Sequence, residues 1–521
     1  MRIGVDVGGT NTDAVVMDGR TVLASHKAPT SENVSDGIVA AIGEVLRRAD
    51  ASAADVRTVM IGTTHFTNAF VQRQHLLPVG IVRIALPSSR GIPPLSDWPA
   101  DIAEAMGPHH HMITGGYQFD GSVADPLDEG AVAAAARSLR NAGIATVAIT
   151  GLFSPVNPAM EVRAAEIIRQ EMPDAALTLS SQIGRMGILE RENAAVMNAS
   201  LAELSREVVG SFRAALTRLD IRAPFFISQN DGTLMSAAFV ERYPVLTFAS
   251  GPTNSMRGAA YLSGLEDALI ADIGGTTTDI GVLRNGFPRE SSLSVDVGGV
   301  RTNFRMPDVL ALGLGGGSLV AETDAGLTVG PRSIGYRLTR DALVFGGDTL
   351  CATDIAVAAG YAAIGDASRV AHLSAALVQA AVQRIHRIVA EGVDRMKASA
   401  TPVPLVLVGG GAVLIRDAIG GTSEVIVPEH AGVANAIGAS IAQISGETDR
   451  VFAYEAVGRE AALEEAANEA RDKAVAAGAD PATLEIIDRE EVPLAYMPGG
   501  AVRIRVKVSG DLDLARSGDT A

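Results

Sequence analysis

The sequence predicts an α/β fold made of two duplicated halves, followed by a small α+β region at the C-terminal end. Three observations lead to this prediction. A segment near the N-terminus recurs near the middle of the chain, short apolar runs alternate with helical patterns as far as residue 445, and the composition changes after that point. With 521 residues the chain is too long for one hydrophobic core. We therefore expect three regions, residues 1–180, 181–445 and 446–521.

The repeated segment is IGVDVGGTNTDAVV at Ile3–Val16 and LIADIGGTTTDIGV at Leu269–Val282. An alignment without gaps matches Asp6 with Asp272, and a Gly-Gly-Thr turn and a Thr-Asp pair follow in both copies. A short apolar run, a glycine turn and a second β-branched run are typical of a β-hairpin. We therefore expect two equivalent hairpins, produced by an internal duplication.

The two turns have the composition of phosphate-binding loops. Backbone N–H groups in a glycine turn, with threonine hydroxyls beside them, can surround phosphate oxygens. A carboxylate at each strand end can hold Mg²⁺ through water. The structural alternative is a tight hairpin in which the aspartate bonds backbone N–H groups, but two matching copies favour the binding interpretation. The predicted phosphate-binding residues are Gly8, Gly9, Thr10, Asn11, Thr12 and Asp13 in the first loop and Gly274, Gly275, Thr276, Thr277, Thr278 and Asp279 in the second, with Asp6 and Asp272 as the Mg²⁺-binding and catalytic candidates.

The first region continues with a helical apolar pattern over Ser35–Arg48 and a buried strand over Val56–Gly62. That strand runs into GTTHFTNAF, and ligand-binding loops of α/β folds lie at such strand ends. A Thr-rich helix cap is the structural alternative. The substrate-side candidates at this strand end are Thr63, Thr64, Thr67 and Asn68.

The run His109–His111 invites a metal interpretation. Adjacent histidines, however, do not share one face of a helix or a strand. We therefore expect a solvated loop there.

The second region contains one long helical pattern, Ile188–Leu219, and then a strand, Pro224–Asn230, that ends in the polar loop SQNDGT. Asn230 and Asp231 in this loop are further substrate-side candidates. Ala434–Ile444 is rich in small residues and is expected to be a helix that packs closely at a domain interface. Two apolar runs break into triple glycines, Gly315, Gly316 and Gly317 in LGLGGGS and Gly409, Gly410 and Gly411 in LVLVGGG.

The third region begins with a Glu/Ala-rich pattern over Ala453–Ala476, which predicts a solvated amphipathic helix. Leu484–Asp488 and Val502–Val508 are predicted strands, and the second alternates apolar with basic residues. This region is expected to be a small appendage or a docking surface.

Composition and charge narrow the class of protein. The chain is 47% apolar and 20% charged, as in ordinary globular proteins. Its net charge of −17 and the absence of a Lys/Arg-rich run argue against a nucleic-acid partner. Cys351 is the only cysteine, which excludes an internal disulfide and a multi-cysteine iron–sulfur or zinc site. No apolar stretch of about 18 residues predicts a membrane span, and no signal-peptide pattern precedes the first strand, so we expect a cytoplasmic protein.

Seven motifs occur in an order that resembles one known family. They are VDVGGTNTD, GTTHFTNA, SGPTNS, DIGGTTTD, LGLGGGS, ATDIAVAAG and VGGGAVL, the last followed by VIVPEHAGVANAIGA. The chain is similar over residues 1–442 to the ATP-binding A-type subunits of the hydantoinase/oxoprolinase family. The two hairpin turns also resemble the phosphate-1 and phosphate-2 loops of the actin/heat-shock-chaperone/sugar-kinase superfamily. The resemblance implies two actin-like (ribonuclease H-like) domains around an ATP cleft, with adenosine beside Gly315–Gly317 and Gly409–Gly411.

This resemblance also implies a chemistry. ATP would activate a cyclic amide, such as a hydantoin, 5-oxoproline or a lactam, by phosphorylating the amide oxygen, and ring opening would follow. ATP and Mg²⁺ are the implied cofactors, and Asp6 or Asp272 is the candidate general base. A B-type or other second subunit is the implied partner, a homodimer is compatible with the sequence, and no nucleic acid or membrane is expected. The family also includes A-type subunits of ATP-dependent ketone carboxylases.

The sequence departs from the family pattern at three places. Leu310 stands where the family has the histidine of Asp-Ile-His-Thr, Thr253-Asn254 replaces a glycine-rich pair, and Asn230-Asp231-Gly232 replaces Asn-Gly-Gly. These differences describe a short, divergent branch and keep two other functions open. One is a small-molecule kinase of the same superfamily, and the other is an ATP-driven reactivase or assembly factor.

Overall fold

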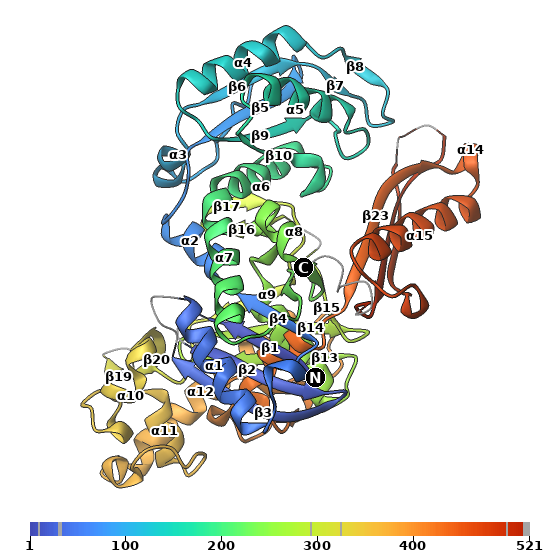
Figure 1. Ribbon diagram of the computed structural model, residues 1–521. Coiled ribbons are helices and arrows are strands. Elements are labelled where there is room, and N and C mark those ends of the chain that lie inside the picture. The colour runs from blue at the N-terminus through green and yellow to red at the C-terminus, as the bar shows by residue number, and fades with distance from the viewer. Residues whose placement is uncertain are drawn as a thin grey trace.

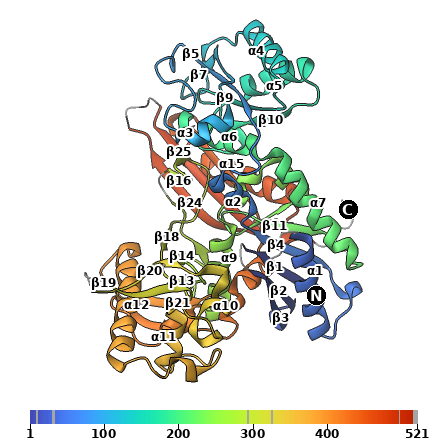
Figure 2. The same ribbon diagram turned by 90° about the vertical axis from the view of Figure 1, so that its left-hand side faces the viewer.

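The computed structural model describes residues 1–8, 11–29, 34–291, 294–323, 326–495, 497 and 499–513. Figure 1 shows a central body that carries an upper lobe, a lower lobe and a C-terminal arm. The central body contains two mixed β-sheets, one from each half of the duplication (Figure 2).

The first sheet has the strand order β12-β11-β4-β1-β2-β3. Strands β1 to β3 are consecutive antiparallel strands, whereas β4 pairs parallel to β1 and β11 pairs parallel to β4. Because β11 and β12 belong to this sheet, the predicted boundary between residues 180 and 181 does not separate the two sheets. The strands are β1 (Arg2–Val7), β2 (Asn11–Asp18), β3 (Thr21–Pro29), β4 (Thr58–Thr63), β11 (Phe225–Ser228) and β12 (Leu234–Ser236), and the helices of this half are α1 (Val34–Arg48), α2 (His65–Gln72), α6 (Ile188–Ser200), α7 (Ala202–Arg218), α8 (Ala237–Arg242) and α9 (Ser250–Ser263).

The second sheet repeats this topology with the order β15-β14-β13-β21-β22, and β18 also pairs with β14. Its antiparallel hairpin β13–β14 lies beside the parallel strand β21, as β1–β2 lies beside β4. The two hairpin turns even share one hydrogen bond, from Gly8 N–H to Asn11 O at 3.0 Å and from Gly274 N–H to Thr277 O at 2.9 Å. The predicted α/β fold with two duplicated halves is therefore confirmed. The strands are β13 (Ala268–Ile273), β14 (Thr278–Arg284), β15 (Phe287–Pro288), β18 (Val309–Leu312), β21 (Val403–Val408) and β22 (Thr422–Ile426), with a small ribbon of β16 (Val295–Val297) and β17 (Val300–Thr302).

Two helices join the halves. The small residues of α13 (Ala434–Ser440) let it pack against both α9 and β1. A Cβ on Gly438 would lie 1.8 Å from the carbonyl oxygen of Asn254, and a Cβ on Gly258 would lie 1.9 Å from that of Ala434. Only glycine therefore permits this helix crossing. The last helix of the second half thus packs on the first strand of the first half.

The upper lobe is a four-stranded parallel sheet, β10-β9-β5-β6, inserted after α2. The edge strand β6 contains His110 and His111, two of the three adjacent histidines. The prediction of a solvated loop is therefore wrong for these two residues. An edge strand tolerates them because only Ile113 of β6 is buried. The elements are β5 (Val79–Leu86), α3 (Ala100–Met106), β6 (His110–Thr114), β7 (Gly116–Tyr117), β8 (Val123–Asp125), α4 (Glu129–Asn141), β9 (Thr146–Gly151), α5 (Ala159–Glu171) and β10 (Ala176–Leu179).

The lower lobe comprises β19 (Ser318–Thr323), β20 (Gly326–Ser333), α10 (Leu338–Asp341), α11 (Ala352–Ala358) and α12 (Ala375–Met396) (Figure 1). It interrupts the second half between β18 and β21. It therefore follows the second hairpin along the chain and precedes the Gly409–Gly411 turn.

The C-terminal arm is a three-stranded antiparallel sheet, β23-β25-β24, with a helix on one face. Val502, Ile504 and Val506 of β25 pack against the alanines of the helix. The alternate residues of β25 face the opposite side of the sheet. One of them is Lys507, whose Nζ lies 2.8 Å from the carboxylate of Asp231. The elements are β23 (Ile444–Ala453), α14 (Tyr454–Val457), α15 (Arg459–Ala476), β24 (Glu485–Pro493) and β25 (Ala501–Gly510). Within the residues that the structure describes, no helix is both long and apolar enough to cross a membrane.

Candidate functional site

Four aspartates, two from each hairpin, are electrostatically coupled to one another. Asp6 of β1 pairs across the ladder with Asp13 of β2, and Asp272 of β13 pairs in the same way with Asp279 of β14. Burial raises the pKa of Asp6 to about 7, and the negative charges of Asp13 and Asp272 add to this rise. Burial also raises the pKa of Asp272, and burial and then the charge of Asp272 raise the pKa of Asp279 to about 7. The duplication therefore brings carboxylates from both halves into one electrostatic cluster.

The joining helices supply the polar partners of this cluster. Asn435 of α13 donates its side-chain N–H to Asp6 Oδ2 at 2.9 Å, and Ser255 of α9 donates its hydroxyl to Asp272 Oδ2. The Nδ2 atom of Asn254 and the Oδ1 atom of Asp6 lie 2.4 Å and 2.6 Å from the point where a Cβ on Gly62 would be. Asn254 is fully buried, and its side-chain amide makes no hydrogen bond within the described part of the chain. Helices α9 and α13 thus orient the aspartates as well as connect the halves.

Sequence reasoning did not single out these three helix residues as site residues. The available signal for Asn254 was the polar run SGPTNS, in which Thr253-Asn254 departs from the glycine-rich family pattern. Asn435 lies in a helix that the small-residue pattern marked only as an interface.

One cation is placed beside the cluster. Lys27 of β3 lies opposite Asp13 in the ladder, and its Nζ is 2.6 Å from the Asp13 carboxylate. Its positive charge opposes the burial-driven rise in the pKa of both Asp6 and Asp272. Lys27 was also missing from the sequence-based site, because the strand after the first hairpin carries no motif.

The second predicted phosphate loop has an exposed tip and a buried base. Gly275, Thr276 and Thr277 are exposed, whereas Thr278 is buried and donates its hydroxyl to Leu314 O at 2.7 Å. Thr278 therefore fastens the loop to the segment after β18. The exposed tip is the part that phosphate oxygens can reach.

The first loop is described in part. Asn11 is exposed, Thr12 is buried, and Gly8 makes the turn hydrogen bond given above. The predicted residues Gly9 and Thr10 lie outside the described residues. Phosphate binding by either loop stays a prediction.

The first triple glycine supports the second loop. Gly316 N–H bonds Gly274 O at 3.0 Å, Gly317 N–H bonds Gly275 O at 2.7 Å, and Gly315 N–H bonds the Ser318 hydroxyl at 2.8 Å. These contacts hold the loop backbone in place, and they occupy the N–H groups of all three glycines.

The second triple glycine packs on the start of the same loop. Gly411 N–H bonds Ile273 O at 2.7 Å, and a Cβ on Gly409 would lie 2.3 Å from Asp272 Oδ1. Gly410 has open space at its Cβ position, so this glycine offers a free backbone face. Adenosine binding at either triple glycine stays a prediction.

The candidates at the end of β4 lie near the cluster. Asp6 is next to Gly62 in the β1–β4 ladder, and Ser250 of α9 donates its hydroxyl to Thr63 O at 3.1 Å. Thr67 donates to Phe248 O at 2.7 Å, and Asn68 donates to the Thr64 hydroxyl at 3.3 Å. The bonds of Ser250 and Thr67 tie the start of α2 to the segment where α9 begins. The Thr64 side chain, at the N-cap of α2, makes no capping hydrogen bond, and the substrate role of these residues stays a prediction.

Asn230 and Asp231, in contrast, do not join the aspartates. Asn230 donates to Val245 O and accepts from Ala249 N–H, so it fixes the turn before α9. Asp231 faces Lys507, and although burial raises the pKa of Asp231, this charge brings it below the ordinary value. Both residues line a cavity of about 1510 Å³ bordered by α7, α8 and the C-terminal arm. A substrate role for them would belong to that cavity.

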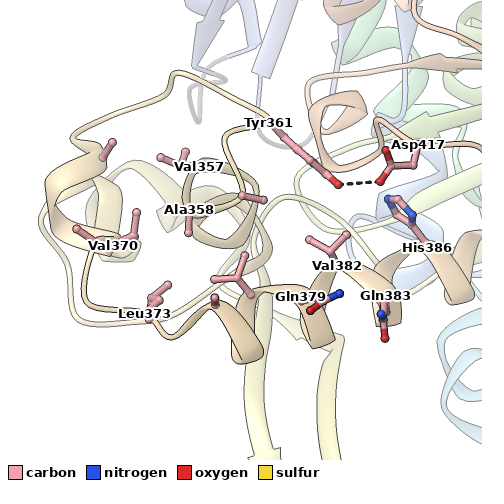
Figure 3. Close-up of a pocket in the computed structure, with 15 residues that line it drawn as sticks. Val357, Ala358, Tyr361, Val370, Leu373, Gln379, Val382, Gln383, His386 and Asp417 are labelled. Carbon is pink, nitrogen blue, oxygen red and sulfur yellow. Dashed lines mark hydrogen bonds between the residues drawn. The ribbon is translucent and has the colours of Figure 1, made fainter.

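A second cavity, of about 810 Å³, lies in the lower lobe (Figure 3). Tyr361 donates to Asp417 Oδ2 at 2.9 Å, and His386 lies on the same side of the cavity. None of the four site aspartates lines it. We assign it no part in the carboxylate cluster.

The pH dependence of the free energy of unfolding should reflect the raised pKa values of the aspartate cluster. Because the folded-state pKa values of Asp6 and Asp279 are raised to about 7 from 3.8, the folded protein binds more protons than the unfolded chain between these values. The free energy of unfolding should therefore fall as pH rises through this range. Stabilisation by Mg-ATP should be larger above pH 7 than below it, since a cation needs ionised carboxylates.

Thermal unfolding on both sides of pH 7, with and without Mg-ATP, measures these effects. The variant Asp6→Asn should flatten the pH dependence of the free protein. Equal stabilisation by Mg-ATP at both pH values would contradict this view of the cluster.

The fold and the paired hairpins define an α/β protein with two duplicated halves. Residues 2–172 match the hydantoinase/oxoprolinase N-terminal region, and residues 191–363 match the hydantoinase/oxoprolinase main region. The chain belongs to the hydantoinase/oxoprolinase family, as its motifs predict.

Curated relatives include a caprolactamase subunit alpha from Pseudomonas jessenii, 28% identical over 386 residues, which are 70% of this chain and 55% of that protein. An acetophenone carboxylase gamma subunit from Aromatoleum aromaticum is 28% identical over 402 residues, 69% of this chain and 53% of that protein. The chain thus spans about half the length of the curated relatives it matches. Among solved structures, the ATP-dependent caprolactamase from Pseudomonas jessenii aligns with a TM-score of 0.78 at 20% identity, covering 98% of this chain and 87% of that one. This last similarity confirms the fold.

Proposed function

We propose that this protein is an ATP-dependent subunit that phosphorylates the carbonyl oxygen of a cyclic amide and so prepares the ring for opening. The observation that carries the proposal is the convergence of two equivalent hairpins on one carboxylate cluster. Membership of the hydantoinase/oxoprolinase family supports the choice of substrate class.

The chemistry explains why ATP would be needed. An unstrained amide carbon is a poor electrophile, and phosphorylation of its oxygen gives an imidate phosphate that water attacks readily. Phosphoryl transfer requires positioning and charge neutralisation rather than a covalent protein nucleophile. The exposed glycine loop would position the phosphates, and charge neutralisation would come from Lys27 and from Mg²⁺ held by the carboxylates.

The residues present fit Mg²⁺. Asp6 Oδ1 is buried without a hydrogen-bond partner in the described part of the chain, and Asp272 is the matching carboxylate of the other half. No group of three or more His, Cys, Asp or Glu side chains in the described residues could hold a metal by itself. That suits Mg²⁺, which keeps several waters and takes one or two carboxylates together with substrate phosphates. When bound, Mg²⁺ would neutralise phosphate charge.

The chain's own residues have distinct roles in this proposal. The exposed tip Gly275–Thr277 binds phosphate oxygens, and Lys27 offsets negative charge beside Asp13. Asp272 accepts a proton at its carboxylate, a role that its raised pKa favours, while the Ser255 hydroxyl holds the carboxylate in place.

A second subunit and a second substrate class follow from the relatives. The two relatives described above are named as an alpha and a gamma subunit, so we infer that this chain also works with a partner protein. The acetophenone carboxylase relative favours a ketone as the alternative substrate, because its carbonyl oxygen offers the same phosphorylation site.

The test is ADP release from Mg-ATP across a panel of hydantoins, 5-oxoproline, lactams and ketones, with this chain alone and with a candidate second subunit. We expect one cyclic amide to stimulate ADP release and to yield phosphate and a ring-opened acid. A stable phosphate ester would instead identify a kinase. Tight binding of a large partner enzyme, without stimulation by any member of the panel, would identify a reactivase.

A further inference from the structure

The most exposed large apolar side chain in the described residues is Tyr336, which is 76% accessible. Single exposed aromatic residues are common on protein surfaces, so exposure by itself carries no function. The position of Tyr336 is what distinguishes it.

Tyr336 belongs to a segment that is bonded to the second phosphate loop. The Ser333 hydroxyl donates to Gly275 O of the loop at 3.3 Å, and Ile334 N–H donates at 3.0 Å to Gly317 O of the triple glycine that supports the loop. A Cβ on Gly335 would lie 3.8 Å from the Thr276 hydroxyl oxygen. The residue immediately before Tyr336 therefore lies beside Thr276 at the exposed tip of the loop, and Tyr336 belongs to the segment that borders the candidate phosphate site.

Two arginines follow Tyr336 in the same short segment. Arg337 and Arg340 both pair with Asp341, at 3.3 Å and 2.6 Å, and both side chains stay partly or largely exposed. An aromatic face with guanidinium groups next to a phosphate loop combines the features that bind a nucleotide: stacking for the base and positive charge for the phosphates. No apolar neighbour covers the ring to the extent that a core tyrosine is covered, so its face is available.

We propose that Tyr336 stacks on the base of the bound nucleotide and makes the site selective for a nucleoside triphosphate over inorganic polyphosphate. This inference rests on the proposed ATP binding. It adds a base-recognition residue at the tip of the second loop, separate from the glycine turn at Gly409–Gly411 that packs on the start of that loop.

The experiment compares the dissociation constants of Mg-ATP and Mg-tripolyphosphate for the wild type, Tyr336→Ala and Tyr336→Phe. Removal of the ring should weaken Mg-ATP binding roughly tenfold, because base–aromatic stacking has about that value. Tripolyphosphate has no base, so its affinity should not change. Tyr336→Phe should bind like the wild type, since stacking needs the ring and not the hydroxyl.

Phe239 is the matched control, an exposed aromatic residue of α8 that is 41% accessible and contributes to a different cavity. Phe239→Ala should leave both affinities unchanged. If Tyr336→Ala leaves Mg-ATP affinity unchanged, or weakens both ligands equally, the stacking proposal is overturned while ATP binding stands. If the wild type binds neither ligand, the proposed function itself fails. Loss of binding to a second subunit with unchanged ATP affinity would assign the ring to a protein contact and overturn stacking.

Discussion

Asp272→Asn should reduce ATP hydrolysis by about a thousandfold or more, while the protein stays folded. In the proposed function the substitution removes a carboxylate that would hold Mg²⁺ through water and accept a proton, and losses of about this size follow removal of one preorganised electrostatic group. Folding should survive because the asparagine oxygen can still accept the hydroxyl of Ser255. Asp272 is half-buried and burial raises its pKa, so a neutral side chain at this position should cost little stability.

The measurement is ADP release at saturating Mg-ATP, accompanied by a thermal unfolding curve. Asp267→Asn is the matched control, because Asp267 lies just before the same strand but is exposed. Its ion pair with Arg284 is long, at 3.9 Å. It should retain wild-type hydrolysis. Hydrolysis by Asp272→Asn within a few-fold of the wild type would remove Asp272 from the mechanism and leave Asp6 as the candidate base.

The fold and the core of the site could be predicted because the duplication is local in sequence. Each hairpin needs only about fourteen consecutive residues to be recognised, and the same pattern with Asp6 and Asp272 occurs twice. Equivalent sequence then gave equivalent geometry, including the shared turn hydrogen bond. The small residues of Ala434–Ile444 likewise predicted close packing, which the contact between Gly438 and Asn254 confirms.

The partners of the aspartates could not be predicted, because they come from distant segments. Asn435 reaches Asp6 across 429 positions of sequence, and no local pattern marks it. Lys27 follows the first hairpin without a motif, although the ladder places it beside Asp13. The same distance effect hid the partner of Asp231, which is Lys507 of the C-terminal arm, and the substrate role of Asp231 stays a prediction.

A break within a predicted helix also could not be predicted from the sequence. Ile188–Leu219 has continuous helical periodicity, yet the chain forms α6 and α7 with a break at Leu201. The side-chain amide of Asn198 donates to Arg242 O near that break, and this tertiary contact has no signature in a single sequence. Local sequence patterns therefore predicted where the loops lie along the chain, whereas tertiary contacts determine which loops lie close together in the fold.

Gly62→Ala should lower ATP hydrolysis by about a hundredfold with a smaller effect on stability. Its new methyl group would lie 2.6 Å from Asp6 Oδ1 and 2.4 Å from Asn254 Nδ2, so one or both side chains must move. A displacement of about 1 Å at a positioning group can reduce a rate by this factor. The atoms in the way are the ends of side chains rather than backbone, so overpacking should cost only about 1–2 kcal/mol.

Gly43→Ala is the control, because a Cβ there lies at an ordinary 3.7 Å from a leucine methyl group and the residue is inside helix α1. That variant should keep full hydrolysis and be slightly more stable than the wild type. Stability comes from denaturant unfolding and activity from ADP release on the same preparations. If Gly62→Ala lost stability and activity in proportion, the loss would reflect unfolding. Full activity in the folded variant would show that the position of the Asp6 carboxylate does not control the reaction. A folded variant with strongly reduced hydrolysis agrees with an Asp6 whose carboxylate must be held by Asn435 of α13 beside Asn254 of α9.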